Sequence, residues 1–145
     1  MEQDPAEDLW RVLLETRLAF PMSSYFSWDG RFSTALLRLS TEAEAHALVQ
    51  SGLGKVLPVI YENDALTQAP DAIRAVIDGL GGIRPGQHLH TYTVGEDTIV
   101  YAAWWPWQDG SSVSVRIGTF ALTEAKVHGN AALAMVKNIF TKNQI

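Results

Sequence analysis

The chain has 145 residues, of which 47% are hydrophobic, 10% aromatic and 19% charged, a composition that suits one globular domain over residues 1–145 and excludes a disordered chain. Its 11 Lys and Arg against 16 Asp and Glu give a net charge of −5, which disfavours nucleic acid and anionic membranes as partners. The absence of cysteine excludes disulfides and thiolate chemistry, and with no signal peptide or apolar membrane span in the sequence we expect a soluble, cytoplasmic protein.

The chain opens with a predicted helix over residues 5–19. Its apolar residues recur at helical spacing, and Pro21 ends it because the residue before a proline avoids the helical region. Asp29 and Gly30 then form a two-residue turn signal, which predicts a hairpin whose second arm covers residues 31–39. That arm also fits helical spacing, so a helix is the alternative to the favoured strand.

Two further helices flank a short strand. A capping box at Thr41 opens a helix to residue 51, and Gly52 is expected to end it. Residues 56–61 are apolar and β-branched, which predicts a strand, and Pro58 favours a sheet edge or a bulge because proline donates no ladder hydrogen bond. Pro70 opens the next helix, whose apolar face is followed by terminating glycines.

Three strands and a helix are predicted in the remainder of the chain. The strands cover about residues 87–94, 98–106 and 111–122, and the short turns between them are typical of an antiparallel meander. Alternation along the third strand predicts one buried face and one wetter face. The last helix begins near residue 123, with an interruption expected at Gly129 and Asn130.

The predicted element order is therefore α-β-β-α-β-α-β-β-β-α. Strands joined by hairpins, with helices packed on one side, indicate an α+β fold. The antiparallel sheet would consist of an N-terminal hairpin, one short strand and a C-terminal three-strand meander. No motif in the sequence is specific enough to indicate a family.

The most informative feature is a cluster of three tryptophans, Trp104, Trp105 and Trp107, where the second strand of the meander ends. A strand sends neighbouring side chains to opposite faces, so burying all three is difficult, although at least one is expected to close the core. Large amphipathic rings near solvent favour a partner or ligand site. Tyr101 should share a face with Trp105, and the alanines between them leave room for an apolar group.

His88 and His90 point to a different function. Residues two apart on a strand share a face, so both imidazoles could reach one metal ion. The candidate third ligands are His128, His46, Glu62 and Asp64. The competing interpretation is a pair of polar residues on the wet face of a sheet, since two histidines alone supply only part of a coordination shell.

The sequence thus predicts a small binding module and leans against an enzyme. It would engage a protein partner or a modest apolar ligand, need no cofactor, and could also form a homodimer through the same surface. The residues expected at that surface are Tyr101, Trp104, Trp105 and Trp107. The alternative is a small metal-dependent enzyme or metal-binding protein that uses His88 and His90. A third interpretation buries every aromatic residue in the core and places the partner surface elsewhere.

Overall fold

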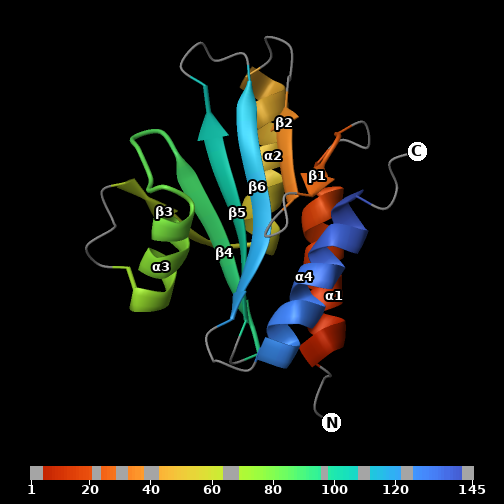
Figure 1. Ribbon diagram of the computed structural model, residues 1–145. Coiled ribbons are helices and arrows are strands. Elements are labelled where there is room, and N and C mark those ends of the chain that lie inside the picture. Colours follow the sequence, from red (N-terminus) through yellow and green to blue (C-terminus); the bar gives the residue numbers. More distant parts are fainter. Residues whose placement is uncertain are drawn as a thin grey trace.

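The computed structural model describes residues 5–20, 24–28, 33–37, 43–63, 69–95, 98–107, 112–121 and 126–141. In these ranges the chain forms four helices and six strands in the predicted order, which confirms the α+β class (Figure 1). The helices are α1 (Pro5–Leu18), α2 (Ala43–Val56), α3 (Asp71–Gly79) and α4 (Lys126–Thr141). The strands are β1 (Ser27–Trp28), β2 (Ser33–Leu37), β3 (Val59–Glu62), β4 (His88–Val94), β5 (Thr98–Pro106) and β6 (Val113–Ala121).

The six strands form one antiparallel sheet in the order β1-β2-β6-β5-β4-β3. Strands β4, β5 and β6 are the predicted meander, joined by short connections. The N-terminal hairpin extends the sheet where β2 pairs with β6, and β2 is the strand that was favoured over a helix. At the other end β3 pairs only with β4 among the described strands, so the edge position expected from Pro58 is confirmed.

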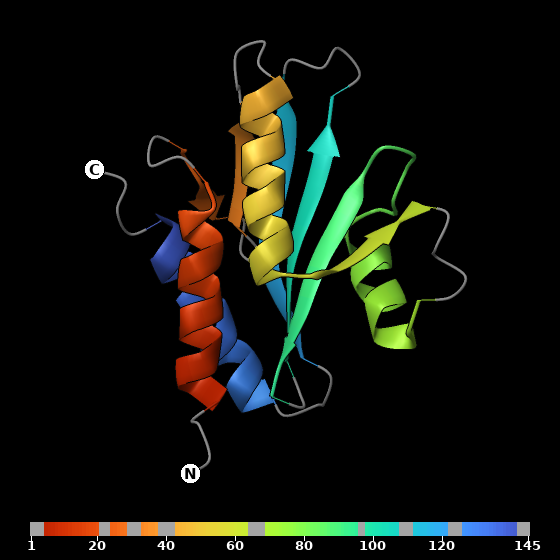
Figure 2. The same ribbon diagram turned by 180° about the vertical axis from the view of Figure 1, so that it is seen from behind.

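The helices cover both faces of the sheet, which corrects the expectation that they pack on one side (Figures 1 and 2). Helices α1, α2 and α4 share one apolar core with the sheet, and α3 forms a second core on the opposite face. Helix α3 buries Ile73, Val76 and Ile77, the face predicted from its spacing. Because both faces of β5 contribute to a core, this strand is enclosed on each side.

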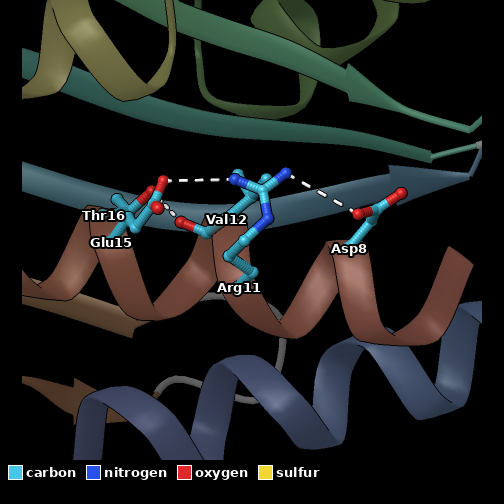
Figure 3. A network of polar contacts seen from close by, with 5 residues as sticks. All are labelled: Asp8, Arg11, Val12, Glu15 and Thr16. Atoms are coloured by element: carbon cyan, nitrogen blue, oxygen red, sulfur yellow. Dashed lines mark hydrogen bonds and ion pairs between the residues drawn. The ribbon is translucent and has the colours of Figure 1, made fainter. Parts of the chain in front are cut away.

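Helix α1 separates the larger core from solvent. Outside, the Arg11 guanidinium lies between two carboxylates, with Nη2 3.7 Å from Asp8 Oδ1 and Nη1 3.4 Å from Glu15 Oε2 (Figure 3). Inside, the buried Thr16 hydroxyl donates to the Val12 carbonyl at 2.7 Å, so this polar group is hydrogen-bonded although it is out of reach of water. Exposed ion pairs contribute little to stability, so apolar packing holds this helix in place.

The predicted end of α2 at Gly52 is wrong, because the helix continues to Val56. Gly52 lies against Ala19, where an added Cβ would be 3.2 Å from the Ala19 Cβ. The glycine therefore allows α1 and α2 to approach closely. The apolar face of α2 continues to Leu53, and Leu57 beyond the helix is also fully buried. The helix ends there because Pro58 follows.

The turn predicted at Asp29 and Gly30 lies outside the described residues. The antiparallel pairing of the hairpin is present on either side of it, with Trp28 opposite Ser33. Trp28 packs against the larger core.

The interruption predicted in the last helix is wrong. Helix α4 continues through Gly129 without interruption. The cost of a helical glycine is about 1 kcal/mol, which the burial of Val136 and Phe140 offsets.

Candidate functional site

The three clustered tryptophans lie in three different environments. Trp104 belongs to the core beneath α1, α2 and α4 and is only 2% exposed. Trp105 points to the opposite face and is half-buried against the core beneath α3. Trp107 follows the end of β5 and is 48% exposed. The prediction that Trp104 and Trp105 face opposite sides of the sheet is confirmed, as is the grouping of Tyr101 with Trp105.

Only part of the binding surface predicted from the sequence is accessible in the structure. Trp104 is sealed in one core, and Tyr101, at 6% exposed, is buried in the other. Both corrections have the same physical cause: helices cover the two faces of β5, so its central side chains are enclosed whichever way they point. Trp105 and Trp107 remain accessible because they lie at the end of the strand, where this cover stops.

Polar contacts hold Trp107 and Trp105 in defined positions. The Trp107 indole donates from Nε1 to Ser114 Oγ at 3.0 Å, and its backbone N–H donates to the Ser112 carbonyl at 2.9 Å. The Arg116 guanidinium lies over the Trp105 ring, with Cζ 4.8 Å from the ring centroid, which is a cation–π contact. An exposed ring that is already fixed loses less conformational entropy when it binds a partner.

Two small hollows lie at the C-terminal end of α3, and Trp105 borders the first of them. The first has a volume of about 150 Å³ and is lined by Leu80, Gly81, Gly82, Arg84, Gln87 and Trp105. The second has a volume of about 140 Å³ and is lined by Ala75, Val76, Gly79, Leu80, Tyr101, Thr119 and Phe120. Leu80 borders both. A cavity of roughly 150 Å³ holds one benzene-sized ring, so each hollow has room for a single side chain.

Gly118 makes room for the Tyr101 side chain that lines the second hollow. The two residues are opposite each other in the β5–β6 ladder. A Cβ added at Gly118 would lie 2.6 Å from Tyr101 Cζ, which is closer than van der Waals contact permits. The Tyr101 ring therefore lies across the glycine, and the absence of a side chain at position 118 sets the shape of this hollow.

We expect Gly118→Ala to lower the free energy of unfolding by about 1–3 kcal/mol, because the new methyl group must displace the buried Tyr101 ring. Urea denaturation measures this change. Gly79→Ala is the matched control, since position 79 borders the same hollow but has nothing within 4 Å of an added Cβ. A Gly118→Ala protein as stable as Gly79→Ala would contradict this placement of Tyr101.

Sequence reasoning missed several residues of this face. Arg116 lies within the strand predicted over residues 111–122, and Leu80 lies near the end of the helix that Pro70 opens. Neither assignment indicates contact with the tryptophan cluster, because the position of α3 over the sheet is a tertiary property. Gly118 did carry a usable signal, since a glycine inside a strand often marks the close approach of another group.

On the opposite face, His88 lies between α2 and β3. Its Nδ1 is 3.0 Å from Gln50 Nε2, and its Nε2 is 2.9 Å from Glu62 Oε1. Glu62 is therefore the one proposed third ligand found beside the pair. Asp64 and the side chains of His46 and His128 lie outside the described residues. Among the described side chains, no group of three or more His, Cys, Asp or Glu could hold a metal ion.

His90 is only 1% exposed, so the competing interpretation of a polar pair on a wet face is wrong for this residue. Its ring centroid is 6.3 Å from that of His88, and neither of its ring nitrogens has a hydrogen-bond partner. Burial, and to a smaller extent repulsion from His88, lowers the pKa of His90 to about 4. The Leu57 backbone opposes this pKa shift, although it lies outside hydrogen-bonding geometry. His90 is thus a neutral core residue at physiological pH.

Comparison with protein-family models, curated proteins and solved structures finds no match to this chain. Within the ranges that the structure describes, none of the helices combines the length and apolar character needed to cross a membrane. Function is therefore inferred from the residues of the two faces themselves.

Proposed function

We propose that this chain is a small binding module that engages a protein partner through its α3 face. The α3 face is defined as Trp105, Trp107 and the two hollows that meet at Leu80. The main support is the position of Trp107, an exposed ring held by a hydrogen bond to Ser114, on the same end of the sheet as the hollow bordered by Trp105. Exposed tryptophans beside small pockets are frequent anchors of protein interfaces.

The size of the hollows favours a protein partner over an enclosed small molecule. Sites for drug-sized ligands typically measure about 300–1,000 Å³. Each hollow here is near 150 Å³ or less and opens to the surface. Two neighbouring hollows of this size fit two apolar side chains from one partner, which is how anchor residues commonly enter an interface.

The charges on the α3 face indicate what else the partner carries. Arg84 borders the first hollow, so the ionic side chain in its lining is basic. The chain as a whole is acidic, with a net charge of −5, which makes this positive charge local. A partner segment with an acidic residue beside its apolar anchors would complement it and would associate faster at low salt.

A pull-down from extracts of the native cells, followed by mass spectrometry, tests the proposed function. Trp107→Ala should lose the captured partner while changing stability by less than about 1 kcal/mol, because the ring is at the surface. Trp10→Ala is the matched control, since Trp10 is also 48% exposed but lies on α1. Capture of the same proteins by both variants and the wild type would contradict a partner site at Trp107.

The alternative, a metal-dependent enzyme or metal-binding protein using His88 and His90, has weaker support. Both ring nitrogens of His88 already contact Gln50 and Glu62, and His90 is sealed in the core. A metal ion would have to break the contacts of the first residue and expose the second. Metal analysis of protein purified without a histidine tag would revive this alternative if it found stoichiometric Zn²⁺, Mn²⁺ or Fe²⁺.

A further inference from the structure

The outer edge of β3 is apolar and open to a partner. β3 ends the strand order, and no described strand pairs with its outer side. Val59 is 48% exposed and Ile60 is 43% exposed, and the two residues point to opposite faces of the sheet. An exposed apolar edge strand, without a lysine or a bulge to block it, is a ready template for another strand.

The backbone groups that face outward can be assigned from one hydrogen bond. The Thr91 hydroxyl donates to the Val59 carbonyl at 2.8 Å, so this carbonyl points toward β4. Backbone groups alternate along a strand, which turns the N–H and C=O of Ile60 and Glu62 away from β4. By the same alternation the nitrogen of Pro58 points away from β4, so the lack of an N–H at this residue costs the β3–β4 ladder no hydrogen bond.

We propose that β3 pairs antiparallel with β3 of a second copy of this chain, with Ile60 of each copy opposite Ile60 of the other. In this twofold arrangement the two Ile60 residues exchange backbone hydrogen bonds, each N–H donating to the other's carbonyl. Each Glu62 N–H donates to the Pro58 carbonyl of the second copy. Every outward N–H of the two strands then has a hydrogen-bond partner. Because Pro58 has no N–H, the Glu62 carbonyl opposite it accepts hydrogen bonds from water instead.

Side-chain chemistry selects a second copy and this register. Ile60 meets Ile60 on one face of the joined sheet, and Val59 of each copy meets Tyr61 of the other on the opposite face. The two Glu62 carboxylates lie at opposite ends of the paired segment, about 13 Å apart along it, so they do not repel strongly. A register shifted by two residues would instead place each Ile60 against a Glu62 carboxylate, which already contacts His88.

Sedimentation analysis of the wild type and of Ile60→Lys tests the pairing. The wild type should be a dimer, and Ile60→Lys should weaken dimerisation by at least about tenfold, because it places two positive charges opposite each other at the centre of the pair. Leu18→Lys is the control, since Leu18 is 64% exposed on α1 and should leave the dimer intact. A monomeric wild type, or a dimer that survives Ile60→Lys, would overturn the proposal.

The absence of cysteine from the chain allows a second test that does not depend on disrupting the dimer. Opposite residues in a hydrogen-bonded antiparallel pair have Cα atoms about 5.5 Å apart, within the range for a disulfide. Mild oxidation should therefore cross-link Ile60→Cys into a covalent dimer but not Leu18→Cys. Tyr61→Cys would cross-link preferentially in the shifted register, so that result would overturn the pairing of Ile60 with Ile60.

Discussion

Replacing Trp104 by alanine should lower the free energy of unfolding by about 3–5 kcal/mol, the range for truncating a buried tryptophan. Trp104 is 2% exposed and packs in the core that α1, α2 and α4 form with the sheet. Loss of the indole would leave a cavity that the surrounding helices can fill only in part. Urea denaturation followed by circular dichroism measures the change without relying on tryptophan fluorescence.

Trp107→Ala is the control for this prediction. The two residues are three apart in sequence, but Trp107 is 48% exposed. Its replacement should change the free energy of unfolding by less than about 1 kcal/mol. Equal losses for Trp104→Ala and Trp107→Ala would contradict the assignment of one ring to the core and the other to the α3 face.

The second large effect concerns His90 and the dependence of stability on pH. The pKa of His90 is lowered to about 4 in the folded chain, against an ordinary value of 6.5. Above pH 6.5 the imidazole is neutral in both the folded and the unfolded chain, so it adds no pH dependence to the free energy of unfolding. As pH falls from 6.5 toward 4, the unfolded chain binds a proton and the folded chain does not, so unfolding is favoured. The loss approaches about 3 kcal/mol at the lower end of this window.

His90→Leu should remove this part of the pH dependence and leave stability at neutral pH unchanged or higher. Leucine fills a similar space, and the two ring nitrogens that it removes have no hydrogen-bond partners. Urea denaturation of both proteins between neutral pH and about pH 4 gives stability as a function of pH. The difference between the two profiles isolates His90, because the carboxylates common to both proteins contribute equally to each. Parallel profiles would show that His90 does not stay neutral in the folded core.

Local patterns in the sequence were sufficient for the order of elements and for the direction of side chains along β5. Alternation placed Trp104 and Trp105 on opposite faces, and helical spacing identified the buried face of α3. These properties depend on neighbouring residues in the chain, which is why they could be predicted. The extent of burial could not, because it depends on which face each helix covers. With all helices expected on one side of the sheet, Tyr101 was predicted at the surface, whereas α3 covers it in the structure.

The histidine pair illustrates the same limit. The shared face of His88 and His90 follows from their spacing, and the structure agrees. Their different environments depend on tertiary packing, which buries His90, and on the β3–β4 register, which sets Glu62 opposite His88. A register between strands separated by a helix is not encoded in either segment alone.

The most direct test of a partner site on the α3 face is photo-cross-linking in the native cells. A photo-reactive amino acid at position 107 should form a covalent adduct with one defined protein, and the same amino acid at position 10 should not. The two positions carry equally exposed tryptophans in the unmodified chain, so general surface reactivity cannot explain a difference. Identical adducts at both positions, or none at position 107 where the chain is folded and abundant, would contradict the proposed function.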